Sequence, residues 1–214
     1  MSTIPGPFFI TFEGGEGAGK STQIAYLAEA LRQAAIDVLA TREPGGAPGA
    51  EAIRRLLLEG DDERWDPVSE ALLHFAARRE HLERTIRPAL ARGTWVLCDR
   101  FADSTTAYQG YGHGIDLAAL TALYRFAVGE QQPDLTLILD LPVEIGLQRA
   151  AARGNAADRY ERRDVAFHTR LRDGYLAIAD SAPHRCVVID ASAPLDAVAD
   201  AVRNCVFARL LRQP

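Results

Sequence analysis

The 214-residue sequence has little of what would place a protein outside the cell or in a membrane. Its three cysteines, Cys98, Cys186 and Cys205, show no metal-ligand spacing, and we expect free, mostly buried thiols in a reducing compartment. No apolar run approaches the ~18 residues that a membrane span requires, and no signal-peptide pattern is visible at the N-terminus. These absences predict a cytoplasmic protein without a membrane-spanning segment.

The sequence also has no excess of positive charge. The formal net charge is −5, so a general nucleic-acid-binding surface is not expected. An anionic small-molecule substrate would have to be met by a local cluster of arginines and not by the overall field. The composition, 48% hydrophobic and 25% charged, is that of an ordinary globular protein, and the length suits a single domain over residues 1–214.

Lysine is nearly absent, and its one occurrence is informative. Of 24 basic residues only Lys20 is a lysine, so its ammonium group is not expected to be a generic surface charge. It lies in a run that matches the phosphate-binding pattern G-x-x-x-x-G-K-[ST]. We call this run the phosphate loop: Gly14, Gly15, Glu16, Gly17, Ala18, Gly19, Lys20 and Ser21. Backbone N–H groups of such a loop point at a nucleotide's phosphates, the lysine reaches the terminal phosphates, and the serine hydroxyl ligates Mg²⁺.

The sequence on either side of the loop decides between this interpretation and a glycine-rich turn that matches by chance. Residues 8–12 form a short apolar run that is typical of a buried parallel strand. Apolar residues after the loop recur at helical spacing: Ile24, Leu27, Ala28 and Leu31. Both flanks therefore favour the strand–loop–helix context that phosphate binding requires.

The same alternation of strands and helices continues to the end of the chain. Strand-like runs are expected at residues 8–12, 37–41, 95–98, 135–139 and 186–189, with helical patterns between and after them. We expect Asp116 to cap a helix from Leu117 and Ser192 to cap the last helix. The pattern predicts an α/β fold with a doubly wound, five-stranded parallel sheet, helices on both faces and ligands at the carboxyl ends of the strands.

Three of these strands end in aspartate, and a phosphate loop normally works with one such residue near Mg²⁺. Asp140 and Asp190 are followed closely by proline, as in strand-to-helix turns, and we expect them to be structural. Asp99 is followed by Arg100 and a polar segment, and we assign it to the metal and the transfer site. Arg100 makes either a plain ion pair with Asp99 or a contact with a second, acceptor phosphate.

One segment interrupts the alternation of strands and helices. Residues 149–163 contain five arginines and a Gly-Asn pair, with no apolar stripe beyond alanine. Such a charge run is either a solvated helix–turn or, in a phosphate-binding protein, a small lid that carries arginines to the transferring phosphoryl group. The loop upstream favours the lid.

Four short motifs together carry a resemblance that no single motif carries alone. FEGGEGAGKST (12–22), TREPGG (41–46), DRF (99–101) and AYQG (107–110) are similar to those of the thymidylate kinase family, which phosphorylates dTMP. The resemblance runs from about Phe9 to beyond Arg163. It implies a P-loop kinase three-layer sandwich with a lid, conversion of dTMP to dTDP with Mg-ATP in dTTP synthesis, and a homodimer.

Carried over position by position, the resemblance implies how ATP and Mg²⁺ are bound. ATP would be bound by the phosphate loop together with Thr22 and Arg149. Lys20 and Ser21 would hold the phosphates and Mg²⁺, with Asp99 near the metal and the transfer site. The family keeps its catalytic arginine either in the loop or in the lid. Because the loop has Gly17 at that position, the chain resembles the bacterial type. Its lid arginines here would be Arg149, Arg153 and Arg159, with Arg153 and Arg159 as the catalytic candidates.

The resemblance also implies an acceptor site. The phosphate of dTMP would be gripped by Arg42, Arg54 and Arg100, and the thymine edge would be hydrogen-bonded by Arg78. The rest of the sugar and base would meet four further residues: Glu16, Ser104, Tyr108 and Gln109. Tyr108 would crowd the 2′ position and so favour deoxyribose.

Two positions depart from the family pattern. The phenylalanine that commonly stacks on thymine is replaced by His74, with Phe75 next to it, so either ring is a candidate for stacking. His113 stands where many relatives have arginine, and we expect a loop residue there and not a phosphate ligand.

Other functions stay open at this point. Another nucleoside monophosphate or a deoxynucleoside is an alternative acceptor, and a P-loop ATPase or switch, or a degenerate relative without activity, is an alternative class. A guanine-reading N-K-x-D motif is excluded, because the only lysine is in the phosphate loop.

Overall fold

Five strands form one all-parallel sheet in the computed structural model, which describes residues 6–61, 64–152 and 159–211. The strands are β1 (Phe9–Glu13), β2 (Val38–Arg42), β3 (Trp95–Asp99), β4 (Leu135–Asp140) and β5 (Cys186–Asp190). Their order across the sheet is β2-β3-β1-β4-β5. The five predicted strands and their parallel arrangement are confirmed, with ends that differ by about one residue.

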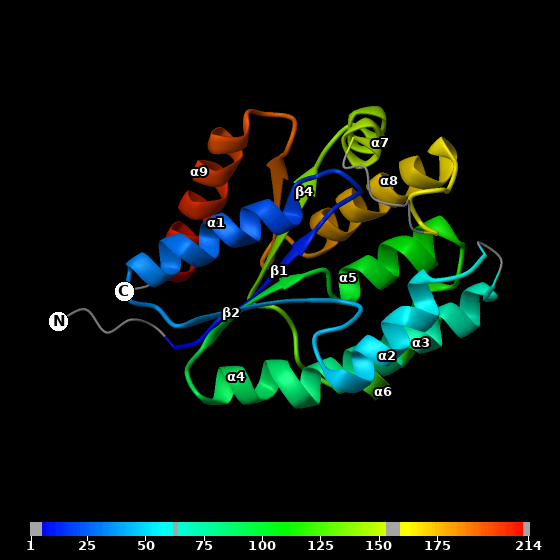
Figure 1. The fold of residues 1–214 in the computed structure, drawn as a ribbon, viewed down its shortest axis with the longest axis horizontal. Helices are drawn as coiled ribbons and strands as arrows, with labels where there is room; N and C mark the ends of the chain where they lie inside the picture. Colours follow the sequence, from blue (N-terminus) through cyan, green and yellow to red (C-terminus); the bar gives the residue numbers. More distant parts are fainter. Residues whose placement is uncertain (1–5, 62–63, 153–158, 212–214) are drawn as a thin grey trace.

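Helices connect the strands and cover both faces of the sheet (Figure 1). They are α1 (Lys20–Gln33), α2 (Pro48–Leu58), α3 (Pro67–His81), α4 (Arg87–Ala91), α5 (Ala102–Thr105), α6 (Leu117–Ala127), α7 (Val143–Ala151), α8 (Val165–Ser181) and α9 (Leu195–Val206). Three π-helical turns extend helices: η1 (Leu82–Ile86), η2 (Thr106–Gly112) and η3 (Phe207–Leu211). This is the three-layer arrangement that the resemblance implies.

The core has two sides because side chains alternate along each strand. In β3, Trp95 and Leu97 face the apolar cluster under α1 and α9, whereas Val96 and Cys98 face the cluster under α3, α4 and α6. A third cluster lies under α8 and η2. The strands are thus buried on both faces, as parallel strands in α/β proteins are.

The predicted helix caps have different outcomes. Asp116 caps α6 as expected, since its side chain accepts a hydrogen bond from the backbone N–H of Ala118. Ser192 does not cap α9, so that prediction is wrong: Pro194 occupies the N-cap position, and the Ser192 hydroxyl donates to Asp190 at 2.6 Å. The Ser192 hydroxyl is engaged in this short local turn and so is not available to cap the helix.

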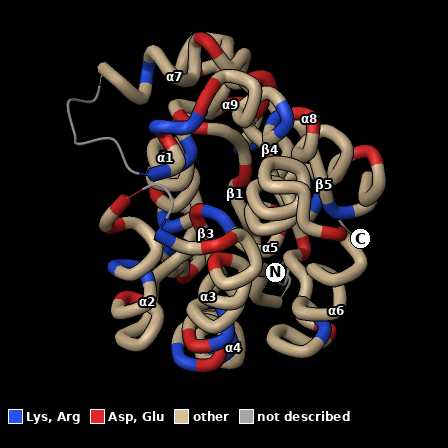
Figure 2. The backbone as a smooth tube through the Cα atoms, turned by 90° about the vertical axis from the view of Figure 1, so that its right-hand side faces the viewer, with Lys and Arg blue, Asp and Glu red and all other residues tan. Residues whose placement is uncertain are grey.

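Charged residues of both signs are spread over the described part of the chain. In the view of Figure 2, Lys and Arg positions are interspersed with Asp and Glu along the backbone. Within the part of the chain that the structure describes, no helix has the length and apolar character needed to cross a bilayer.

Leu31 on α1 tests how strongly the two-sided core is packed. Its side chain is fully buried, so we expect Leu31→Ala to lower the free energy of unfolding by about 2–5 kcal/mol. Leu195, on the same side of the sheet but 48% exposed, is the control, and its alanine variant should stay within about 0.5 kcal/mol of wild type. Chemical denaturation measures both, and equal losses would contradict the described core.

Candidate active site

A cavity of about 560 Å³ lies at the carboxyl ends of the strands, with the phosphate loop on one wall and α3 on another. This volume is in the range of small-molecule sites. The residues predicted from sequence that line it are Glu16, Gly17, Ala18, Gly19, Lys20, Ser21, Thr22, Arg42, Arg54, His74, Arg78, Asp99, Arg100, Ser104, Tyr108, Gln109 and Arg149. The fold therefore brings most of the predicted residues together around one cavity.

A few predicted residues are not on this cavity wall. Gly14 and Gly15 line a separate small cavity behind the loop, while Phe75 and Arg159 are buried in the protein. Arg153 lies outside the described residues. The predicted lid, residues 149–163, is therefore described only at its two ends.

Lys20 is held inside the phosphate loop by the loop's own carbonyls. Its ammonium donates to the carbonyl oxygens of Gly14 at 3.1 Å and Gly15 at 2.9 Å, and the side chain is buried. Burial, together with the positive charge of Arg100, lowers the pKa of Lys20 to about 8. The ammonium is thus present at neutral pH and lies close to its point of deprotonation.

Gly17 has a conformation and surroundings that exclude any side chain. Its φ is +69°, and a Cβ there would lie 2.1 Å from the carbonyl oxygen of Gly146 on α7. An arginine at this position of the loop would therefore require α7 to move. The close packing of the loop against α7 therefore accounts for glycine at this position.

Asp99 and Ser21 form a hydrogen-bonded carboxylate–hydroxyl pair at the mouth of the phosphate loop. Ser21 Oγ donates to Asp99 Oδ2 at 2.6 Å, from the first turn of α1 to the end of β3. Hydroxyl and carboxylate oxygens are ligands that Mg²⁺ accepts, and Mg²⁺ at phosphate sites commonly takes one or two protein oxygens, with water and phosphate completing its shell. Among the described residues no group of three or more His, Cys, Asp or Glu is placed to hold a metal ion alone. The pair therefore fits a metal that arrives with a nucleotide.

Arg100 ties the loop to the opposite wall. Its backbone is left-handed, with φ +68°, at the end of β3. One guanidinium nitrogen donates to the Gly14 carbonyl at 3.0 Å, to the Ser104 hydroxyl at 3.2 Å and to the Tyr175 hydroxyl at 3.0 Å. The other nitrogen makes a 2.7 Å ion pair with Glu16. Glu16 Oε1 also accepts a 2.6 Å hydrogen bond from the Tyr108 hydroxyl, so loop and wall form one network.

Glu13 was not singled out from sequence, although it directly precedes the phosphate loop. Its carboxylate is fully buried and accepts hydrogen bonds from the Phe101 backbone N–H at 2.7 Å and the Ser104 hydroxyl at 2.5 Å. Burial, and then the charge of Asp103, raise the pKa of Glu13 to about 7. An acidic residue ending an otherwise apolar strand was the available signal. Glu13 holds the turn after β3 in place.

Arg78 is fixed by three acceptors. Its guanidinium donates to Glu43 at 2.8 Å, to the Phe101 carbonyl at 2.9 Å and to the Thr105 hydroxyl at 3.0 Å. Only 2% of the residue is exposed, and Nη1 has no hydrogen-bond partner in the described part of the protein. Glu43 is held in turn by His81 at 3.1 Å. A buried, rigid donor with one unused nitrogen is suited to reading the edge of a base.

His74 and Phe75 separate clearly in the structure. His74 lines the large cavity, and its Nε2 shares a 2.9 Å hydrogen bond with the Tyr160 hydroxyl. Burial, and then the positive charge of Arg78, lower the pKa of His74 to about 3, so the ring is neutral. Phe75 packs in the core beneath α3 and lies 5.0 Å from the Arg78 guanidinium. Consecutive helical residues point about 100° apart, and of the two only His74 lines the large cavity, which favours His74 over Phe75 as the candidate stacking ring.

Arg159 is the predicted residue whose surroundings differ most from expectation. It is 1% exposed, makes a 2.9 Å ion pair with Glu70 of α3, and donates to the Leu57 carbonyl. A lid arginine that acts on the transferring phosphoryl group would line the large cavity, and Arg159 does not. Its neighbours Tyr160 and Glu161 do. Sequence reasoning missed Tyr160 and Glu70, because nothing local links residues so far apart in the chain.

The remaining arginines lie at the rim. Arg42 forms an exposed ion pair with Glu51 at 3.0 Å, and Arg54 donates to the Pro44 carbonyl at 2.6 Å. Arg149, on α7, donates to the Ala191 carbonyl at 3.0 Å. Each of the three guanidinium groups is thus held beside the cavity by a contact with a different part of the chain.

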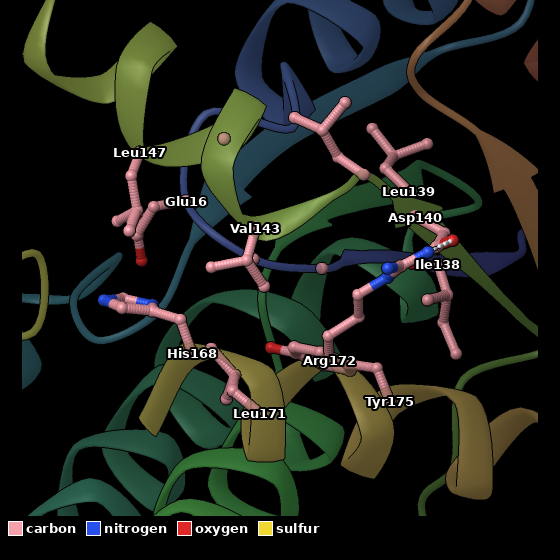
Figure 3. Close-up of a pocket in the computed structure, with 14 residues that line it drawn as sticks. Glu16, Ile138, Leu139, Asp140, Val143, Leu147, His168, Leu171, Arg172 and Tyr175 are labelled. Carbon is pink, nitrogen blue, oxygen red and sulfur yellow. Dashed lines mark hydrogen bonds and ion pairs between the residues drawn. The ribbon is translucent and has the colours of Figure 1, made fainter. Parts of the chain in front are cut away.

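The small cavity behind the phosphate loop, about 20 Å³, shows how the loop is supported (Figure 3). There Arg172 of α8 makes a two-point ion pair with Asp140 at the end of β4, at 2.7 and 2.8 Å. Asp190 is likewise engaged with the backbone and hydroxyl of Ser192. Asp190 therefore makes a local turn contact, Asp140 is paired with an arginine of a distant helix, and Asp99 faces the large cavity.

Comparison with known proteins gives consistent matches over most of the chain. A family model described as thymidylate kinase matches residues 12–202. The chain is 63% identical to thymidylate kinase of Caulobacter vibrioides, over 95% of this chain and 97% of that protein. It is 57% identical to thymidylate kinase of Nitrobacter winogradskyi, over 95% and 89%. The crystal structure of thymidylate kinase from Ehrlichia chaffeensis superimposes with a TM-score of 0.77 at 37% identity, covering 94% of this chain and all of that one.

The raised pKa of Glu13 predicts a pH-dependent stability. Between the unfolded value of 4.5 and about 7, the folded protein binds more protons than the unfolded chain, so stability falls as pH rises through this window. Glu13→Gln cannot ionise, and we expect its stability relative to wild type to improve by about 3 kcal/mol from pH 4.5 to 7.5. Urea titrations at several pH values measure this difference, and parallel pH profiles would show that Glu13 titrates normally.

Proposed function

The chain belongs to the thymidylate kinase family, and we propose that its large cavity is where ATP phosphorylates dTMP. The observation that carries this proposal is the continuity of the cavity. It joins Lys20, on the phosphate loop, to His74 and the buried Arg78 on α3. A cavity with both features offers a place for a donor nucleotide at one end and for an acceptor nucleotide at the other.

At the donor end, the phosphate loop, Thr22 and Arg149 bind ATP. Lys20 exchanges the Gly14 and Gly15 carbonyls for phosphate oxygens, which a mobile ammonium does at little cost. Ser21 and Asp99, which share a hydrogen bond in this structure, would hold Mg²⁺. When bound, Mg²⁺ supplies neutralisation of charge on the phosphate oxygens.

At the acceptor end, the positive groups Arg42, Arg54 and Arg100 receive the dTMP phosphate. Arg78 donates its unused Nη1 to the thymine edge, and the neutral His74 ring lies against the base. The sugar and base are further enclosed by side chains that already line the cavity: Glu16, Ser104, Tyr108 and Gln109. Tyr108 is held by its hydrogen bond to Glu16, which supports its role in excluding a 2′ hydroxyl.

Phosphoryl transfer then depends on alignment and charge. An oxygen of the dTMP phosphate forms a bond to the γ-phosphorus, the bond from that phosphorus to the β–γ bridging oxygen breaks, and ADP leaves with the electron pair. Lys20 and the arginines reduce the repulsion between the two anionic nucleotides and keep them in line. Arg153 remains the lid arginine proposed to act on the moving phosphoryl group.

A homodimer is part of the proposal. Helices α3 and α6 pack side by side and leave apolar side chains exposed on the surface: Val68, Leu72, Leu117 and Phe126. Phe126 is 90% exposed, and an apolar face of this kind is typical of a subunit contact. Sedimentation of wild type and of Phe126→Ser tests this face.

A coupled ADP-release assay with Mg-ATP tests the activity and its acceptor together. We expect turnover that depends on dTMP and is far lower with CMP, AMP, GMP or thymidine. Lys20→Ala and Asp99→Ala should reduce it by about 10³-fold or more, since both remove charge control at the transfer site. Acceptor-independent ATP hydrolysis would instead favour the ATPase or switch alternative.

The lowered pKa of Lys20 predicts how ATP affinity depends on pH. Bound phosphates favour the ammonium, so binding takes up a proton above about pH 8 and affinity falls as pH rises from 7 to 9. The slope should approach tenfold per pH unit above pH 8. Lys20→Arg is the matched control, because its guanidinium stays charged and its weaker affinity should be flat over the same range. Isothermal titration at several pH values separates the two.

A further inference from the structure

One face of α3 holds three different parts of the site. Glu70, His74 and Arg78 are spaced four residues apart, so they lie in a row on the same face of the helix. Each of the three contacts a different residue. Arg78 forms an ion pair with Glu43, and His74 shares a hydrogen bond with Tyr160. Glu70 forms an ion pair with Arg159. His74 and Arg78 line the large cavity, but Glu70 does not; it lies behind the wall, with 1% of its surface exposed.

Glu70 nevertheless contacts a residue that does line the cavity. Its Oε1 accepts a 2.8 Å hydrogen bond from the Gln109 side-chain amide on η2. The amide nitrogen of Gln109 is thereby directed at the buried carboxylate, which fixes the orientation of the whole amide group. Glu70 thus sets how Gln109 stands in the acceptor wall.

The second oxygen of Glu70 fixes the chain at the end of the predicted lid. Oε2 makes the 2.9 Å ion pair with Arg159, whose guanidinium also donates to the Leu57 carbonyl. The next residue, Tyr160, shares its hydroxyl with His74 at 2.9 Å and places its ring edge-on to Tyr108, with centroids 5.2 Å apart. Tyr160 is therefore held on the cavity wall through its own contacts and through Arg159.

Burying the Glu70–Arg159 ion pair costs desolvation free energy. A gain in folding stability does not account for this cost well, whereas a role in shaping the site does. Taking a carboxylate and a guanidinium out of water is unfavourable, and apolar residues of similar size often replace a buried pair without loss of stability. What apolar residues would not provide is a fixed direction for the Gln109 amide and for the backbone before Tyr160. Both of those residues line the acceptor end of the cavity.

We propose that Glu70 is a positioning residue for the acceptor nucleotide, acting through Gln109 and through the Arg159 anchor of Tyr160. The proposal rests on the proposed function, since it specifies how that acceptor site is shaped. It also assigns Arg159 to anchoring and leaves Arg153 as the lid arginine for the transferring phosphoryl group. Glu70 touches no substrate itself.

Steady-state kinetics of Glu70→Gln and Arg159→Gln, with dTMP and ATP varied in turn, test this role. We expect each variant to raise the KM for dTMP by roughly ten- to a hundredfold, the scale on which small misplacements act. The KM for ATP should change far less in both, and Glu70→Gln should keep most of its kcat. The double variant should show about the same KM for dTMP as Glu70→Gln alone, because Glu70→Gln already breaks the contact with Arg159.

Arg185→Gln is the matched control for a purely structural effect. Arg185 forms a two-point ion pair with Asp103, at 2.6 and 2.8 Å, and does not line the large cavity. We expect this variant to lower the melting temperature while leaving the KM for dTMP unchanged. If Glu70→Gln fails to fold, Arg159→Gln and calorimetric dTMP binding without ATP answer the same question.

Three outcomes would count against the proposal in different ways. An unchanged KM for dTMP in folded Glu70→Gln or Arg159→Gln would overturn it. So would a loss of about 10³-fold in kcat with unchanged KM for dTMP in Arg159→Gln, since that is the signature of a catalytic arginine. Absence of dTMP-dependent turnover in the wild-type protein would refute the proposed function itself, and the wild-type arm of the same assay reports it separately.

Discussion

The guanidinium of Arg100 is the contact on which the rest of the site depends. It joins the phosphate loop, through Gly14 and Glu16, to the far wall, through Ser104 and Tyr175. A left-handed backbone in a residue other than glycine costs about 1–3 kcal/mol and persists only where the surroundings enforce it. Here those surroundings are four hydrogen-bonded partners from three separate segments of the chain. Without this contact, the two ends of the cavity would have no fixed relative position.

The acceptor wall is built so that little has to be ordered when a nucleotide binds. Arg78 is immobilised by Glu43 and two further acceptors, and Glu43 is itself held by His81. Groups that are already in place contribute more of their interaction energy to binding, because no side-chain entropy is lost at that moment. The same logic applies to Gln109, whose amide is directed by Glu70. In the proposed function these buried charges serve recognition, and their net contribution to folding stability is expected to be small.

Local sequence patterns were sufficient for the sheet and for the donor end of the site. Each strand is a short apolar run, and the phosphate loop is identified by the spacing of its glycines from Lys20 and Ser21. Both features can therefore be predicted from residues that are neighbours in the sequence. Asp99 was separable from Asp140 and Asp190 because the turn chemistry after each strand differs. The acceptor end depends on contacts between distant segments, which no local pattern contains. The choice between His74 and Phe75 required the rotation of α3, and the partners of Arg159 and Glu13 required the packed structure. The wrong prediction for Ser192 has a similar cause, because the sequence did not show that its hydroxyl would donate to Asp190 instead of capping α9.

The proposed function places the two nucleotides end to end in a single cavity, with Lys20 at one end and Arg78 at the other. A crystal structure of the protein with dTMP and a non-hydrolysable ATP analogue would test this placement. We expect the γ-phosphate at Lys20, the dTMP phosphate at Arg100, and the thymine edge at Arg78 Nη1 against the His74 ring. A monophosphate bound away from α3, or a base that leaves Arg78 Nη1 without a partner, would contradict it.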